Sequence, residues 1–210
     1  MADEIKYIRS YMNQKLEWLH SLPENACRAE LAELRRGVGH IPGDIPALWG
    51  TFLTGLPEEL YGRSGNISYA EWAVYIALTM FALHQQGHDF KTEWMHAQYR
   101  QSEQDSKAAN DKREYHLGRA IRKLAKDDDE LERVLKRFKI LATSSDIREL
   151  SNHLRGVVHL LNGNDIKLDY VELACDLYKY ALSPESRAGV RLSWGQDFWY
   201  SNNNEEKGRE

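Results

Sequence analysis

Apolar residues recur along most of the chain at the three- and four-residue spacing that places them on one face of a helix. The first such run covers residues 5–19 and stops before Pro23. A second helix is predicted over residues 24–36 and ends at Gly37, because glycine readily leaves helical geometry. Pro46 then suits the first turn of another helix.

The clearest helix start is Ser68-Tyr69-Ala70-Glu71, since a serine followed three residues later by a glutamate forms a capping box. Residues 72–83, which follow, are apolar on nearly every side. This pattern is typical of a helix in the middle of a bundle rather than on its surface. The run is shorter than the roughly 18 apolar residues that a membrane-spanning helix needs.

The second half of the chain also shows helical periodicity. Apolar stripes predict helices around residues 117–124, 131–141 and 147–161, and Asp169 and Ser183 are placed to begin two more. No stretch of useful length alternates as a strand does, and no internal repeat is present. The sequence therefore predicts an all-α protein.

A polar stretch divides this helical pattern. It runs from about residue 88 to residue 111, and its Gln-, Ser- and Asp-rich end is the candidate linker or mobile loop. We therefore expect two small helical bundles joined by a polar linker, with an N-terminal domain over residues 1–104 and a C-terminal domain over residues 112–200. Residues 201–210 are polar and are expected to form a disordered tail.

The composition of the chain indicates its cellular compartment more clearly than its function. The 210 residues are 42% hydrophobic, which is enough for a substantial core. The start of the chain lacks the apolar block of a secretory signal. Cys27 and Cys175 form no C-x-x-C pair, and two distant cysteines are weak grounds for a disulfide. These features favour the cytoplasm and no association with a membrane.

The net charge of −4 excludes a surface that is positive throughout, but it leaves room for one positive face. Between residues 113 and 155 there are eleven lysines and arginines against eight acids, a local charge of +3. The distribution of charge, rather than its total, therefore decides whether the protein suits nucleic acid.

Candidate catalytic chemistry is sparse. His84 and His88 lie four residues apart and Asp89 follows, a pattern that evokes a metal-dependent phosphohydrolase. Gly87 lies between the two histidines and is expected to end the helix, so a histidine that simply packs is the favoured interpretation. The chain has no P-loop and no nucleophile elbow, and neither cysteine has the context of a nucleophile. We predict no catalytic residues, no metal site and no cofactor.

The basic residues are better candidates for a functional surface than the histidines. Arg119, Arg122, Lys123 and Lys126 have the spacing of one continuous helical face, which suits either a solvated surface or a phosphate-binding surface. Arg35 and Arg36 end a predicted helix, where cations complement the helix dipole, and they are equally suited to hold an anion from outside.

Several segments together resemble the CasB family, the small subunit of the type I-E CRISPR surveillance complex called Cascade. The similar segments are "RAELAELRRG" followed by a proline and Trp49, "ALTMFALHQQG", "LKRFKILATSSDIRELSNHLRGVVHLL", "LDYVELACDLYKY" and "VRLSWGQDFWY". They occur in the family's order and cover nearly the whole chain. The stretch from about residue 103 to residue 112 matches nothing distinctive.

The resemblance implies an all-helical, non-catalytic protein of two small domains. Two copies pack head to tail in the complex and contact its backbone and large subunits. The family binds nucleic acid without sequence preference and stabilises the R-loop, in contact with the guide RNA and both strands of the target DNA. Matching motifs extend this role to seven arginines of this chain: Arg28, Arg35, Arg36, Arg137, Arg155, Arg187 and Arg191.

Two alternatives to this role remain open. In the first, the protein is a purely structural spacer, whose arginines pair with carboxylates of partner subunits. In the second, it is a metal-dependent nuclease that uses His84, His88 and Asp89. Five aromatic residues also suit base stacking, although core packing or subunit contact is the favoured use of most of them: Trp49, Trp194, Phe198, Trp199 and Tyr200.

Overall fold

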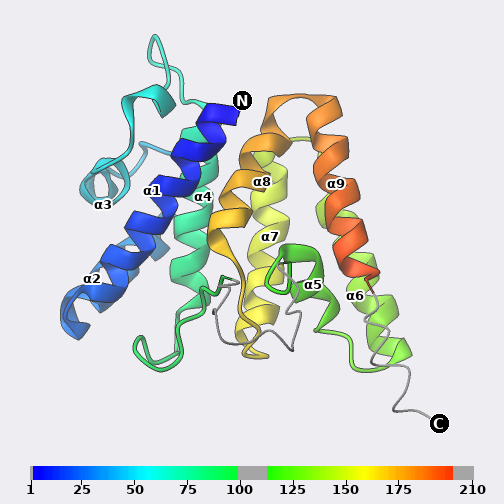
Figure 1. The fold of residues 1–210 in the computed structure, drawn as a ribbon. Coiled ribbons are helices and arrows are strands. Elements are labelled where there is room, and N and C mark those ends of the chain that lie inside the picture. The colour runs from blue at the N-terminus through cyan, green and yellow to red at the C-terminus, as the bar shows by residue number, and fades with distance from the viewer. Residues whose placement is uncertain (1, 99–112, 201–210) are drawn as a thin grey trace, which may run out of the picture.

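The computed structural model of the protein describes residues 2–98 and 113–200. These residues contain helices and no strand, which confirms the all-α prediction (Figure 1). The elements in chain order are α1 (Ala2–Ser21), α2 (Glu24–Arg36), η1 (Pro46–Leu48), α3 (Trp49–Leu53), η2 (Glu58–Leu60), α4 (Tyr69–His84), α5 (Leu117–Arg122), α6 (Asp128–Ala142), α7 (Ile147–Asn162), α8 (Tyr170–Leu182) and α9 (Pro184–Phe198).

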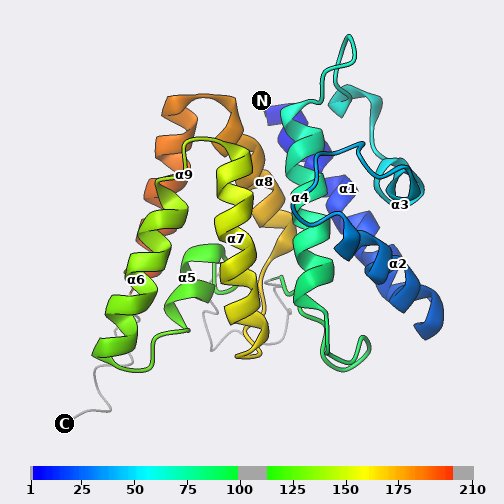
Figure 2. The same ribbon diagram turned by 180° about the vertical axis from the view of Figure 1, so that it is seen from behind.

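The helix α4 lies at the centre of the arrangement. It packs against α2, α7 and α8, and α8 in turn packs against α1 and α9. Figure 1 views the molecule from the side of α1, α8 and α9, and Figure 2 shows the opposite side, where α7 lies between α6 and α4 and α2 lies beyond α4. The short helix α5 packs mainly on α9.

The sequence of α4 explains its central place. Every residue from Ala73 to His84 is buried, so the helix has no face left for solvent along most of its length. Its start is the predicted capping box: the Glu71 amide donates to Ser68 Oγ at 2.9 Å, and the Ser68 amide donates to the Glu71 carboxylate at 2.7 Å. These local contacts begin the helix, and burial of its apolar side chains stabilises its position.

The hydrophobic core is continuous across the described residues. Side chains from α1, α2 and α4 and side chains from α6 to α9 belong to one buried cluster. The division into two domains at the polar linker stays a prediction. Most of that linker, residues 99–112, and the predicted tail, residues 201–210, lie outside the described residues.

The other predicted helix starts are formed by side-chain caps. Asp169 Oδ1 accepts from the backbone amides of Val171 and Glu172, and Ser183 Oγ accepts from the Ser186 amide. Asp127, the first residue of an acidic run, likewise caps α6 by accepting from the Glu130 amide. Each cap satisfies amides that the first turn of a helix leaves without partners.

Gly118 allows α5 to pack directly on the backbone of α9. A Cβ atom at this position would lie 2.2 Å from the Trp194 carbonyl oxygen and 3.0 Å from the Phe198 amide nitrogen. The backbone of a helix cannot move aside as a flexible side chain can, so the two helices must separate to accept any larger residue.

We predict that Gly118→Ala lowers the free energy of unfolding by about 1–3 kcal/mol, because it overpacks the contact between α5 and α9. The matched control is Gly156→Ala in α7, where an added Cβ meets nothing within 4 Å. That control should be neutral or stabilising by up to about 1 kcal/mol, because alanine is the better helix former. Urea unfolding measures both changes, and a stable Gly118→Ala variant would contradict the packing argument.

Asp176 of α8 is a buried carboxyl group. Its Oδ2 accepts from Trp194 Nε1 at 2.7 Å, and Lys179 Nζ lies 3.5 Å from its Oδ1. Burial raises the pKa of Asp176 to about 6, against the opposing attraction of Lys179. The folded-state pKa therefore lies above the usual value of 3.8, so ionisation of this group destabilises the fold. The cost is complete above about pH 6 and disappears as the pH falls towards 4.

We predict that Asp176→Asn improves stability relative to the unaltered protein more at pH 8 than at pH 5, by about 1 kcal/mol. Asparagine keeps an oxygen that accepts from Trp194 Nε1 and never ionises. Urea unfolding of both proteins at the two pH values measures the difference, and every other titrating group cancels in the comparison. Equal effects at pH 5 and pH 8 would contradict a raised Asp176 pKa.

Candidate nucleic-acid interface

The histidines that evoke a metal site are already engaged in the fold. His84 is fully buried, and its Nδ1 shares a hydrogen bond of 2.9 Å with the hydroxyl of Tyr170. Burial, with a smaller effect from His88, lowers the pKa of His84 to about 4, so the ring is neutral near pH 7. Gly87 has φ +92° and follows the end of α4, as predicted.

Asp89 and His88, the other residues of that pattern, make contacts with nearby residues of the fold. The Asp89 carboxylate accepts from the amides of Lys91 and Thr92, both at 2.9 Å, and so closes a turn. His88 Nδ1 lies 3.7 Å from Glu93 and 3.8 Å from Asp165. Within residues 2–98 and 113–200, no three His, Cys, Asp or Glu side chains are placed together to hold a metal ion.

The arginines of α2 differ in their surroundings. Arg28 pairs with Glu24 at 2.5 Å and Arg36 pairs with Glu33 at 2.7 Å, and the two arginine side chains are 67% and 60% exposed. Exposed pairs of this kind contribute about 0–1 kcal/mol, so both arginines can exchange their partner for a phosphate at little cost. Arg35 is half-buried and donates from Nη1 to the Ala82 carbonyl oxygen at 3.4 Å, near the end of α4. Arg35 thus serves a helix terminus, while Arg36 faces outward.

Arg187 and Arg191 of α9 hold the turn between α6 and α7. Arg191 Nη2 donates to the Ser144 carbonyl oxygen at 2.9 Å and to the Tyr180 hydroxyl at 3.1 Å. Arg187 donates from Nη1 to the Ser145 carbonyl oxygen and from Nε to the Tyr180 carbonyl oxygen at 3.1 Å. The structure therefore gives both arginines internal partners, at the positions where the sequence motif suggested nucleic-acid contacts.

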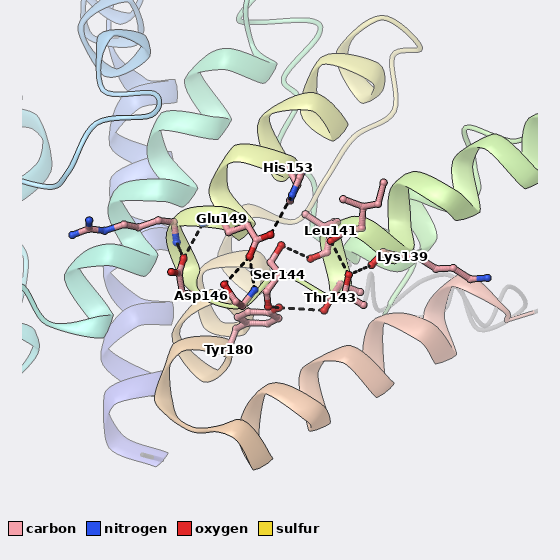
Figure 3. Close-up of polar contacts among 12 residues, drawn as sticks. Lys139, Leu141, Thr143, Ser144, Asp146, Glu149, His153 and Tyr180 are labelled. Carbon is pink, nitrogen blue, oxygen red and sulfur yellow. Dashed lines mark hydrogen bonds and ion pairs between the residues drawn. The ribbon is translucent and has the colours of Figure 1, made fainter.

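Further contacts fix the same turn (Figure 3). The Tyr180 hydroxyl donates to the Ser144 carbonyl oxygen at 2.6 Å, which ties the turn to α8. Asp146 caps α7 by accepting from the Arg148 and Glu149 amides, and the Glu149 carboxylate accepts from the Ser145 amide at 2.6 Å. Together these bonds set the position of α7 relative to α6.

The basic residues 119, 122, 123 and 126 do not form the single continuous helical face that their spacing predicted. The helix ends at Arg122, whose Nη1 donates to the Ala125 carbonyl oxygen, three residues further along the chain, at 3.0 Å. Lys126 lies beyond this end, so its assignment to the same helical face is wrong. Arg119 packs over the Tyr200 ring, 3.6 Å from its centroid, and Lys123 lies 3.5 Å from Glu114.

Arg137 of α6 and Arg155 of α7 contrast with these residues. Both side chains are exposed, and neither has an acidic or hydrogen-bonding partner in the part of the chain that the structure describes. Their helices are consecutive and pack against each other on the side shown in Figure 2. Lys126 is also exposed and has no partner for its ammonium group within the same residues.

The neighbours of Arg155 on α7 were not predicted as site residues. Arg148, Asn152 and His159 recur with Arg155 at spacings of four, three and four residues, and all are exposed. This periodicity is present in the sequence. It was missed because only Arg155 was given a role from the family-like segment, which contains all four residues. The row becomes evident once the helix bounds are known.

The aromatic residues divide between core and surface. Trp194 and Phe198 are buried, as favoured above, while Trp49, Trp199 and Tyr200 are exposed. Trp49 Nε1 donates to the Gly43 carbonyl oxygen at 3.3 Å, which holds the indole against the neighbouring loop. Among the described helices, none is both long and apolar enough to cross a membrane.

Comparison with known proteins gives one family. The family model described as CRISPR-associated protein Cse2 matches residues 30–199. The crystal structure of CasB from Thermobifida fusca is similar at 28% identity and a TM-score of 0.69, over 92% of this chain and 98% of that one. No curated protein sequence matches the chain.

Other solved structures share the fold at lower identity. A Cse2-family protein from Thermus thermophilus is similar at 23% identity and a TM-score of 0.61, over 90% of this chain and 97% of that one. A chain of a structure described as a CRISPR RNA-guided surveillance complex is similar at 20% identity and a TM-score of 0.64, over 99% of both chains.

We predict that Arg191→Met lowers the free energy of unfolding by about 1–3 kcal/mol, because the Ser144 carbonyl oxygen and Tyr180 hydroxyl lose a charged donor. Arg137→Met removes the same charge from an exposed site without a partner among the described residues and should change stability by less than about 0.5 kcal/mol. Chemical unfolding of both variants checks this. An Arg191→Met protein that keeps its stability but loses nucleic-acid binding would make Arg191 a contact residue instead.

Proposed function

The chain belongs to the Cse2 family of CRISPR-associated proteins, and from this premise we propose that it is a non-catalytic small subunit of a type I-E surveillance complex in antiviral defence. In this role it binds nucleic acid without sequence preference and stabilises the R-loop formed by guide RNA, target strand and displaced strand. Its partners are the guide RNA, both strands of the target DNA, the backbone and large subunits and a second copy of itself, in the cytoplasm.

The exposed cations of α6 and α7 carry the nucleic-acid part of this proposal. Arg137 and Arg155 have no internal partner within the described residues, so a phosphate gains their full attraction without breaking an existing pair. Contacts to phosphates position a protein on nucleic acid and carry no sequence information. An R-loop is close to energetic balance, so a few such contacts are enough to shift it towards the open state.

A purely structural spacer is the second candidate, and the outer side of α9 favours it. Leu192 is 64% exposed and Trp199 is 60% exposed. Large apolar side chains on a surface are typical of protein contacts. Such contacts are also compatible with the first candidate, so the two differ only in whether the cations touch nucleic acid.

We predict that the double variant Arg137→Glu/Arg155→Glu weakens target binding by the assembled complex about tenfold or more. The log–log salt dependence of binding should lose about 2 units of slope, since each lost phosphate contact removes about 1. The matched control is Lys6→Glu/Lys91→Glu, which reverses two exposed cations on other elements. An unchanged helical circular dichroism spectrum shows that the variants are folded.

Undiminished R-loop formation by the folded double variant would reject the nucleic-acid role. Crosslinking of labelled single-stranded DNA to the assembled complex separates the two candidates directly. Adducts on α6 or α7 support the first candidate, and adducts confined to other subunits support the spacer.

A further inference from the structure

A cavity lies between α1, α2 and α3, at the opposite side of the molecule from α6 and α9 (Figure 1). Its volume of about 390 Å³ is within the range of cavities that hold small molecules. None of the residues proposed to contact nucleic acid lines it. The lining residues that matter here are Tyr11, Lys15 and Trp18 of α1, Glu30 of α2, and Gly50 and Gly55 in and after α3.

Lys15 is a buried cation on the wall of this cavity. The residue is 7% exposed, and its Nζ donates to the Thr54 carbonyl oxygen at 2.8 Å. Within residues 2–98 and 113–200, no carboxylate oxygen lies within 4.0 Å of this ammonium group. Burial lowers the pKa of Lys15, against the opposing attraction of the more distant Glu30. A buried charge is costly unless it is paired, so the site favours the entry of an anion.

The ammonium group has hydrogen-bonding capacity for such an anion. A lysine carries three N–H donors, and the bond to Thr54 uses one of them. Hydrogen bonds between an ammonium group and a carboxylate are about twice as strong as those between neutral groups. An anion in the cavity would therefore offset the cost of burying Lys15.

Aromatic rings accompany this cation. Lys15 Nζ lies 4.9 Å from the centroid of the Trp18 ring and 5.6 Å from that of the Tyr11 ring. The Tyr11 hydroxyl donates to the Phe52 carbonyl oxygen, so that ring is fixed in place. Trp18 is 38% exposed, and a flat apolar group inside the cavity would remove more of its indole from water.

Two glycines keep one side of the cavity open. An added Cβ atom at Gly50 or Gly55 would meet nothing within 4 Å. Gly55 has φ +81°, a conformation that favours glycine. Gly50 lies in α3 without a positive φ, so neither its backbone nor its packing requires glycine. The missing side chain at Gly50 instead leaves room in the cavity.

Glu30 limits the charge that the cavity accepts. Its carboxylate accepts from the Thr51 hydroxyl and lies more than 4.0 Å from Lys15 Nζ. A second negative charge in the cavity would be repelled by this carboxylate, and repulsion is strong where little water is present. The arrangement therefore favours a monoanion over a phosphate. A donor on the same ligand would be attracted to Glu30.

From this arrangement we propose that the cavity is a binding site for a small organic anion, namely a single carboxylate joined to a flat apolar body. The carboxylate pairs with Lys15 Nζ, while the apolar body packs on Trp18 and fills the space beside Gly50. The site is independent of the proposed function, because none of its residues belongs to the cationic surface of α6 and α7.

Isothermal titration of the full chain with indoleacetate and with indoleacetamide tests this site. The two probes have the same shape, but only the first is an anion, and the indole N–H of both is a donor for Glu30. We expect saturable binding of indoleacetate, and binding of the neutral amide weaker by about tenfold or more, because only the carboxylate gains a charge-assisted bond.

Lys15→Met removes the charge and keeps an unbranched apolar side chain. It should weaken indoleacetate binding by about tenfold or more and leave the two probes equal in affinity. The matched control is Lys6→Met, which removes an exposed cation from the same helix and should change neither affinity. Circular dichroism checks that both variants keep the helical fold.

Gly50→Leu tests the cavity while Lys15 stays in place. Leucine is a good helix former and its Cβ atom meets nothing, so the fold should persist while the side chain fills the cavity. Both probes should then lose about tenfold or more in affinity. Gly156→Leu adds the same bulk to an exposed position of α7 and should leave binding unchanged.

Several outcomes would overturn the site. They are no saturable indoleacetate binding by the unaltered chain, equal affinity for the acid and the amide, or normal binding by a folded Lys15→Met or Gly50→Leu variant. Arg137→Glu/Arg155→Glu should bind indoleacetate normally, so a failure of the proposed function and a failure of this site can be told apart.

Discussion

Burial of α4 on all sides is the constraint on which the rest of the structure depends. An apolar helix of this length cannot remain in water, and it is too short for a membrane, so other helices must cover it. α2, α7 and α8 supply that cover. α2 and α7 each have one face on the core and one exposed face, whereas α8 has no exposed residue. The outward faces of α2 and α7 are therefore held in fixed positions by a core to which they do not themselves belong.

Arginine has two distinct uses in this molecule. Arg187 and Arg191 donate to main-chain carbonyl groups and fix the turn between α6 and α7. Arg137 and Arg155 lie on the two helices that this turn joins, exposed and without internal partners among the described residues. The planar guanidinium suits both tasks, because it offers several donors in a rigid array and keeps its charge when partly buried. The internal arginines position the helices from which the external arginines project.

An acidic protein with a few exposed cations in one place is suited to bind nucleic acid weakly and without sequence preference. The net charge of −4 opposes tight adsorption to any polyanion, whereas the exposed Arg137 and Arg155 offer positive charge at one place, on α6 and α7. Under the proposed function, base pairing with a guide reads the sequence, so that the protein would need only to recognise a backbone. Membership of the Cse2 family places this arrangement in a CRISPR context.

The sequence by itself determined the elements whose causes are local. Ser68 and Glu71 predicted the start of α4, Asp169 and Ser183 predicted those of α8 and α9, and the apolar run after Tyr69 predicted a central helix, because caps and periodicity act within a few residues. The tertiary structure alone decided which arginines are internal. An arginine such as Arg191 has the same appearance in the sequence whether it meets Ser144, more than 40 residues away, or solvent, because only folding brings distant carbonyl groups within hydrogen-bond distance.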